Sequence, residues 1–190
     1  MATKRKLIVI SAPSGSGKST LIEHLKKEIP KLEFSISATN RPIRNGEVDG
    51  REYHFLTDEQ IKKSISENKF IEWQEVYEGR YYGTLKSEID RIAALNKKAI
   101  FDIDVLGGLN IKKLYKDEVI AIFIQPPSIF ELETRLRNRA TDSEQDIKNR
   151  LSKAAEEMEH GKNFDVIIVN DCLETAKNEL LQTVKRFINR

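Results

Sequence analysis

One segment near the start of the chain places an apolar run directly before a glycine-rich turn: Leu7-Ile8-Val9-Ile10-Ser11-Ala12-Pro13-Ser14-Gly15-Ser16-Gly17-Lys18-Ser19-Thr20. Four aliphatic residues without polar alternation predict a strand buried on both faces of a parallel sheet. Apolar residues at helical spacing follow and predict a helix over 18–28. Strand, glycine-rich turn and helix form the context of a P-loop, and the segment matches that pattern except for Ala12, where a glycine is usual.

The residue types in this turn suit the phosphates of ATP. Gly15 and Gly17 let backbone amides converge on an anion, and the helix adds the positive end of its dipole. Lys18 would bridge the β- and γ-phosphates, while the Ser19 hydroxyl would ligate Mg²⁺. The alternative is an ordinary strand-to-helix turn with Lys18 in solvent. We expect ATP to contact Ala12, Pro13, Ser14, Gly15, Ser16, Gly17, Lys18, Ser19 and Thr20.

The rest of the chain alternates apolar runs with helical patterns, which predicts the α/β class. Further buried strands are expected at 99–103, 119–124 and 166–169, and helices at 87–95, 128–138, 144–159 and 173–188. Residues 34–84 interrupt this order with short β-like pieces at 34–37, 52–55 and 70–76. Thr57 and Gln60 resemble a capping box that would open a small helix over 58–67. We therefore expect an insertion over 34–84.

Composition limits the possible partners and location. The 190 residues suit one α/β domain, and 32 Lys and Arg against 30 Asp and Glu give no global reason to expect nucleic acid or a membrane. Cys172 has no partner for an internal disulfide, and the three histidines show no metal-ligand spacing. The first apolar run is too short for a signal peptide, and no segment reaches the roughly 18 to 20 apolar residues of a membrane span. We expect a cytoplasmic protein.

Two acidic residues follow the predicted strand at 99–103. Alternation would place Asp102 and Asp104 on the same side of the sheet. Either could hold Mg²⁺ through water while the other meets substrate or an arginine, and we assign the metal to Asp102. A helix cap near Gly107 is the alternative role for Asp104.

The insertion contains a run of residue types with an unusual order: Phe34-Ser35-Ile36-Ser37-Ala38-Thr39-Asn40-Arg41-Pro42-Ile43-Arg44-Asn45-Gly46-Glu47-Val48-Asp49-Gly50-Arg51-Glu52-Tyr53-His54-Phe55. This run resembles the guanylate kinase signature R-x-x-R-x-G-E-x-x-G-x-x-Y-x-F. Later segments at 70–73, 81–84, 102–104, 126–128 and 168–171 resemble that family in the same order. The resemblance implies a P-loop nucleoside monophosphate kinase fold, with a parallel sheet core, an inserted GMP-binding α+β subdomain and a helical and loop lid. It also implies Mg²⁺-assisted transfer from ATP to GMP, giving ADP and GDP.

Four side chains of the insertion suit a phosphate monoester. Arg41 and Arg44 can present two guanidinium forks to one dianion, and Tyr53 and Tyr82 can add hydroxyl donors. Surface arginines and tyrosines at the edge of the core are the alternative. In the guanylate kinase family these positions bind the phosphate of GMP.

Guanine presents two donors and one acceptor on neighbouring atoms. Glu72 lies in an apolar and aromatic run where an unpaired charge would be costly, so we predict that its carboxylate accepts from N1–H and the 2-amino group. Ser37 and Thr84 are the predicted hydroxyls for the base. The resemblance gives these three residues the same roles and adds Asp104 at the amino group. An alternating strand with Glu72 in water is the alternative.

A cluster of arginines marks the expected lid. Arg135, Arg139 and Arg150 match the lid arginines of the family, where positive charge around the migrating phosphoryl group assists transfer. With Lys18 and Arg41 they form the predicted catalytic set. Arg137 is expected to point elsewhere, and a solvated basic helix face is the alternative for the whole cluster. Asn170, after the last predicted strand, is expected to border the adenine of ATP.

The expected organisation is one domain, residues 1–190, with a core of 1–33, 85–134 and 160–190, an insertion of 34–84 and a lid of 135–159. ATP and GMP are the expected small-molecule partners, with tolerance for dGMP and the choice between monomer and homodimer left open. A sugar-phosphate kinase and a non-catalytic phosphopeptide-binding module are the alternatives. The first has no need for Ser37, Glu72 and Thr84 together, and the second has no need for an intact P-loop.

Overall fold

The computed structural model describes residues 6–138 and 143–190. The chain divides into two compact units, one formed by Met1–Pro30 with Asp102–Arg190 and the other by Lys31–Phe101. The second unit therefore includes the predicted insertion and continues past residue 84. Arg139, one of the expected lid arginines, lies outside the described residues.

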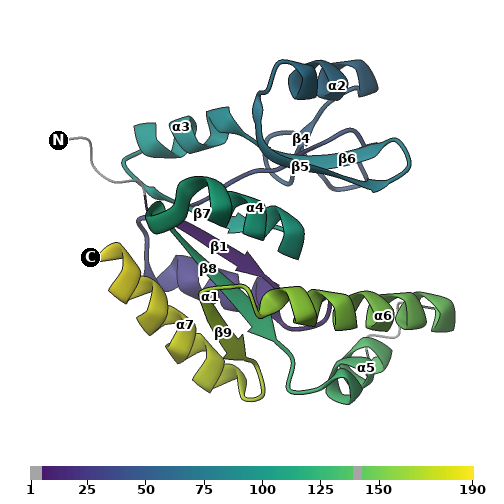
Figure 1. Cartoon of the computed structure of the whole chain (residues 1–190), viewed down its shortest axis with the longest axis vertical. Coiled ribbons are helices and arrows are strands. Elements are labelled where there is room, and N and C mark those ends of the chain that lie inside the picture. The colour runs from purple at the N-terminus through teal and green to yellow at the C-terminus, as the bar shows by residue number, and fades with distance from the viewer. Residues whose placement is uncertain (1–5, 139–142) are drawn as a thin grey trace. The chain divides into compact units, whose positions relative to one another are not determined.

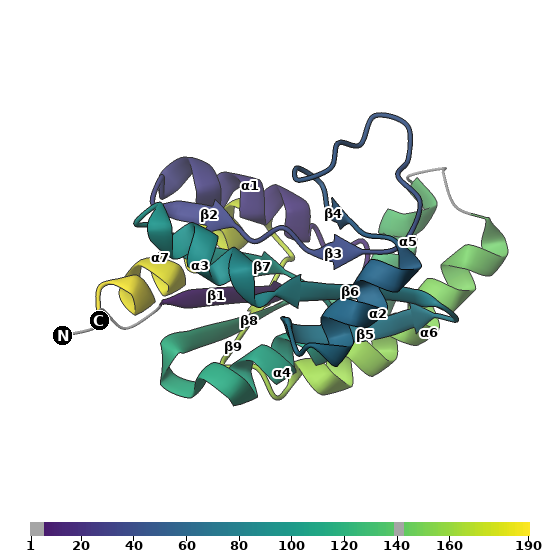
Figure 2. The ribbon, with the colours of Figure 1, turned by 90° about the horizontal axis from the view of Figure 1, so that it is seen from above.

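Parallel strands form the centre of the first unit. β1 (Leu7–Ser11) pairs with β8 (Val119–Gln125), and β8 pairs with β9 (Val166–Val169). Figures 1 and 2 show α1 (Lys18–Glu28) and α4 (Val105–Tyr115) on opposite faces of β1 and β8. Apolar side chains such as Ile8, Ile10 and Phe123 are fully buried between these layers. The end of β1, from which the P-loop turn continues, is thus fixed by a packed core.

The described part of the first unit also contains the helices α5 (Ile129–Asn138), α6 (Glu144–Gly161) and α7 (Leu173–Ile188) and a short turn. α7 packs on α1 and β9, and α5 packs on α6. A 3₁₀ turn, η1 (Lys116–Glu118), leads into β8. α6 begins at a capping box between Ser143 and Asp146, which explains why the helix starts at residue 144.

The second unit holds two sets of strands. β2 (Leu32–Phe34) and β7 (Lys98–Asp102) pair in parallel. A separate sheet has the order β4-β3-β6-β5 and is formed by β3 (Ala38–Thr39), β4 (His54–Phe55), β5 (Phe70–Tyr77) and β6 (Arg80–Leu85). Ala38 and Phe70 of this sheet and Ile61 of the helix α2 (Asp58–Ser66) form one buried apolar cluster. The helices of this unit are α2 (Asp58–Ser66) and α3 (Lys86–Ala94).

Most predicted helices and strands are confirmed within a few residues, including the capping box at Thr57 and Gln60. The predicted strand over 34–37 is wrong except at its first residue, because β2 ends at Phe34 and β3 begins only at Ala38. Burial of 166–169 on both faces is also wrong. β9 stands at the end of its sheet, and Ile167 and Val169 are 38% and 45% exposed.

The sequence did not predict α4, whose first turn contains two glycines, poor helix formers. A Cβ on Gly108 would lie 3.0 Å from side-chain atoms of Ser11, Val9 and Phe164. Close packing on β1, which is a tertiary requirement, therefore explains a glycine inside this helix. Among the helices of the described ranges, none is both long and apolar enough to cross a membrane.

Candidate active site

The turn after β1 depends on glycine for its shape. Gly15 and Gly17 have φ values of 99° and 85°, a region that side chains with a Cβ rarely adopt. Gly17 is also the N-cap residue of α1, and a Cβ there would lie 2.5 Å from Nδ2 of Asn170. That buried amide donates a 2.8 Å hydrogen bond to the carbonyl oxygen of Ser16. Asn170, expected beside adenine, thus braces the turn itself.

Two features of this turn fit an anionic ligand. The first turn of α1 contains no acidic residue, so the N-terminal end of the helix dipole is not offset there. The hydroxyl of Ser16 is buried and has no hydrogen-bond partner within the described chain. A phosphate oxygen is an acceptor that could satisfy such a donor.

Lys18 interacts with carboxylates of the first unit. Its ammonium pairs with Oδ1 of Asp102, and the two side chains are 20% and 25% exposed. Burial raises the pKa of Glu157 on α6, while the charges of Lys153 and Lys18 act to lower it. Asp104 caps α4 by accepting from the backbone N–H of Gly107 at 3.0 Å. Asp104 is therefore the N-cap of α4, the alternative role that the sequence indicates for it.

Ser19 and Asp102 supply few but suitable oxygens for Mg²⁺. Mg²⁺ prefers oxygen ligands and keeps several waters or phosphate oxygens, so one hydroxyl and one carboxylate fit it when ATP is bound. No group of three or more His, Cys, Asp and Glu residues in the described ranges could hold a metal ion. The residues fit a metal that arrives with phosphate and do not form a cage of protein ligands.

Two arginines, one from α5 and one from α6, contact the turn after β1 or Asn170, which holds that turn. Arg150 donates to the hydroxyl of Ser14 at 2.5 Å. Arg135 donates to the carbonyl oxygen of Asn170 at 3.1 Å and pairs with Glu131. Arg137 instead pairs with Glu133 and Glu144, away from the turn.

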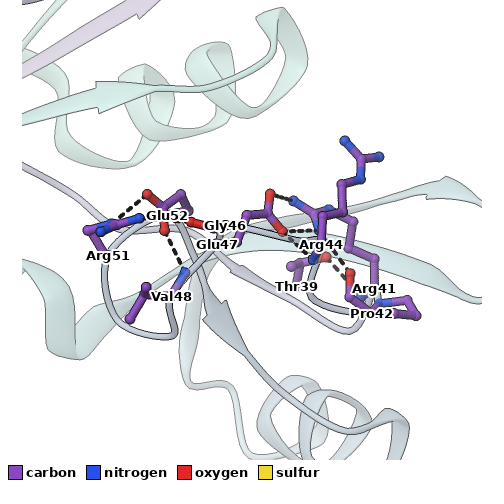
Figure 3. Close-up of polar contacts among 9 residues, drawn as sticks. All are labelled: Thr39, Arg41, Pro42, Arg44, Gly46, Glu47, Val48, Arg51 and Glu52. Carbon is purple, nitrogen blue, oxygen red and sulfur yellow. Dashed lines mark hydrogen bonds and ion pairs between the residues drawn. The ribbon is translucent and has the colours of Figure 1, made fainter.

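In the second unit, Arg41 is held by a carboxylate six residues later (Figure 3). Nη1 and Nη2 of Arg41 lie 2.7 and 2.5 Å from the two oxygens of Glu47, and Nη1 also donates to Pro42 O. The guanidinium lies 5.0 Å from the ring centroid of Tyr53. The hydrogen bonds from Arg41 lower the pKa of Glu47 to about 2.

This arrangement leaves one edge of the Arg41 fork for another anion. Within the described chain, no hydrogen bond engages Nε of Arg41, while Glu47 occupies the end formed by Nη1 and Nη2. Arg44 donates its backbone N–H to Glu47 at 2.8 Å, and its guanidinium extends away from that carboxylate (Figure 3). A phosphate could therefore bind both arginines without displacing Glu47.

The predicted base-reading residues are partly assembled within the same unit. Glu72 is buried at 6% exposure and accepts a 2.7 Å hydrogen bond from the hydroxyl of Thr84, which faces it across β5 and β6. The rings of Tyr53 and Tyr82 meet edge to face at 5.9 Å. Ser37 is half-buried just before β3, and its carbonyl oxygen accepts from the N–H of His54.

A family model described as guanylate kinase matches residues 4–188 of the chain. The chain belongs to the guanylate kinase family. A guanylate kinase of Bacteroides thetaiotaomicron is 50% identical over 185 residues, which cover 97% of this chain and 91% of that protein. One from Porphyromonas gingivalis is 51% identical over 185 residues, covering 96% of this chain and 98% of that protein.

The fold of the guanylate kinase family also matches. The crystal structure of guanylate kinase from Anaplasma phagocytophilum aligns with a TM-score of 0.73 at 27% identity, over 98% of this chain and 87% of that one. The predicted α/β class, with a parallel sheet flanked by helices, and the P-loop nucleoside monophosphate kinase fold are confirmed, as is the resemblance read from the motifs.

Two carboxylates, one in each unit, contact or lie near predicted site residues and were not predicted from the sequence. Glu47 stands in the family signature, and its six-residue distance from Arg41 within a turn was the available signal. Glu157 lies seven residues after Arg150 on α6, so both occupy one helical face. That spacing could have linked the two residues, although the helix carries several other glutamates.

Proposed function

We propose that the chain transfers the γ-phosphate of ATP to GMP, giving ADP and GDP. Membership of the guanylate kinase family supports this reaction. The observation that carries it in the structure is the buried pair of Glu72 and Thr84, in a unit that also contains the Arg41 fork and two tyrosines. A carboxylate has two acceptor oxygens, and this number suits the two neighbouring donors of guanine, N1–H and the 2-amino group.

The first unit supplies the residues for ATP. We assign phosphate binding to the turn from Ala12 to Thr20, with Lys18 moving from Asp102 to the β- and γ-phosphates. Asn170 holds the turn through Ser16. Mg²⁺, bound with Ser19 and, through water, Asp102, would neutralise charge on the phosphates.

Arginines would stabilise the charge of the migrating group. Arg150 already contacts Ser14, and Arg135 contacts the brace of the turn, so both are near the position assigned to phosphate. We include Arg139 by its match to the family pattern. No general base is needed, because the GMP phosphate is already an anion at neutral pH and can attack in line once both substrates are held.

The second unit supplies the residues for GMP. Arg41, Arg44, Tyr53 and Tyr82 would hold its phosphate through charged forks and hydroxyl donors. The base would be read by Glu72, Ser37 and Thr84, with Asp104 added by the family pattern. AMP would place an acceptor opposite Glu72, and sites that use hydrogen bonds in this way discriminate by about 10⁴.

The remaining assignments concern organisation and setting. We assign the GMP-binding insertion to 34–84 and the lid to 135–159, within one functional domain of 1–190. We place the protein in the cytoplasm, as a monomer or homodimer that uses ATP with GMP or dGMP. The phosphopeptide-binding alternative is not favoured, because the P-loop residues Gly15, Gly17 and Lys18 are all present.

An ADP-release assay with Mg²⁺-ATP tests the proposal by comparing GMP, AMP, UMP and CMP. We expect turnover with GMP that Lys18→Ala abolishes and that Glu72→Gln lowers chiefly for GMP. Glu78→Gln, an exposed change on the β5–β6 hairpin, is the matched control and should behave as the unchanged protein. A folded protein that binds GMP but turns over none of the acceptors would refute the proposed reaction.

A further inference from the structure

A second buried glutamate lies near the residues assigned to GMP. Among the described residues, Glu72 and Glu88 are the two charged residues in the buried class. Glu88 belongs to the first turn of α3, and its side chain is 4% exposed. A carboxylate so deeply buried is costly unless its oxygens are fully paired.

Four hydrogen bonds satisfy this carboxylate. Oε1 accepts from Nε2 of His54 and from Nε of Arg91, each at 3.0 Å. Oε2 accepts from the backbone N–H of Ile36 at 2.9 Å and from Nη2 of Arg91 at 3.0 Å. The hydrogen bonds from Arg91, Ile36 and His54 outweigh the effect of burial and hold the pKa of Glu88 below its ordinary value. Glu88 is therefore an anion that binds three separate segments together.

Two of those segments are directly joined to residues assigned to GMP. Ile36 precedes Ser37, and His54 follows Tyr53. The same two segments bond to each other, because the N–H of His54 donates to the carbonyl oxygen of Ser37 at 2.9 Å. Glu88 itself follows Thr84 by four residues, at the start of the helix that continues from β6.

We propose that Glu88 is a positioning residue for GMP: it fixes the Ile36–Ser37 segment and strand β4 against α3, so that Ser37, Tyr53 and Thr84 keep their spacing. This role rests on the proposed function, which assigns those three residues to GMP. It differs from the role assigned to Glu72, because Glu72 would contact the base itself, whereas Glu88 acts on GMP only through the segments that it holds.

Glu88→Gln is the informative change because it keeps the size of the side chain. An amide NH₂ in place of either oxygen faces two donors, so two of the four hydrogen bonds must be lost or rearranged. Glu33→Gln is the matched control. Glu33 belongs to the same ionic network through Arg91 at 3.6 Å and Lys97 at 2.6 Å, and among the described residues no hydrogen bond or ion pair joins its carboxylate to Ile36 or His54.

The test measures, on the full chain, the dissociation constants of GMP and of ATP by calorimetry and the KM of each substrate. For Glu88→Gln we expect GMP to bind about tenfold more weakly and its KM to rise alike, with ATP unchanged within about twofold. Glu33→Gln should leave both substrates within about twofold. His54→Phe, which removes one of the four hydrogen bonds at a side chain that is 29% exposed, should weaken GMP by a smaller factor.

Three results would overturn the inference. The first is a Glu88→Gln protein with a lowered melting temperature and unchanged GMP affinity, which would leave only a structural role. The second is an equal loss of GMP and ATP affinity. The third, if Glu88→Gln does not fold, is a His54→Phe protein with unchanged GMP affinity. Failure of the unchanged protein to bind GMP would instead refute the proposed function, and the inference with it.

Discussion

Replacing Gly17 by alanine should damage the P-loop through two separate effects. The backbone at Gly17 has φ 85°, and an added Cβ would lie 2.5 Å from Nδ2 of Asn170. Alanine in a left-handed conformation costs about 1 to 2 kcal/mol. Moving the Asn170 amide off Ser16 leaves buried polar groups unpaired, which costs about 1 to 3 kcal/mol more. The free energy of unfolding should therefore fall by about 2 to 5 kcal/mol.

A double-mutant cycle separates the two effects. In an Asn170→Ala background the amide is absent, so Gly17→Ala should cost only the backbone strain of about 1 to 2 kcal/mol. The coupling between the two positions should therefore be about 1 to 3 kcal/mol. Urea unfolding of the full chain, followed by far-UV circular dichroism, measures all four proteins. Additive losses would show that the contact between Gly17 and Asn170 does not restrict the turn.

Three further changes give distinct results. Glu47→Gln should raise the KM for GMP and leave that for ATP unchanged, because Arg41 loses the carboxylate that orients it; a lower KM for GMP would show that Glu47 competes with phosphate instead. Arg150→Ala should lower kcat more than it raises the KM for GMP. Arg137→Ala is the control and should leave both constants unchanged, because Arg137 pairs with Glu133. If the two variants lose kcat equally, Arg150 has no special role. Burial raises the pKa of Glu157 above its ordinary value of 4.5. The ionised carboxylate therefore destabilises the folded chain at pH values above the raised pKa, and this destabilisation disappears as the pH falls below 4.5. Glu157→Gln should therefore stabilise the chain near pH 8 and lose that advantage near pH 4, and a gain of equal size at both pH values in thermal unfolding would contradict this reasoning.

The parts of the fold that the sequence predicts are those with local causes. The helix after the P-loop, the small helix opened by Thr57 and Gln60, and the long helix ending at Ile188 follow from spacing and capping within a few residues. α4 could not be predicted in this way. Its Gly107 and Gly108 count against a helix locally, and the reason for Gly108 lies in the close approach of Ser11, Val9 and Phe164.

The two buried glutamates show the same limit within the candidate site. Glu72 stands out in the sequence because aromatic and aliphatic residues surround it, so its burial could be foreseen from its neighbours. Glu88 stands in Lys86-Ser87-Glu88-Ile89, where an acid in the first turn of a helix is ordinarily a solvated residue that favours the helix dipole. Its burial depends on donors from Ile36, His54 and Arg91, two of them more than thirty residues away along the chain. Local pattern can therefore identify a buried carboxylate whose sequence neighbours are apolar, whereas the burial of a carboxylate such as Glu88 becomes visible only when the fold brings its distant donors together.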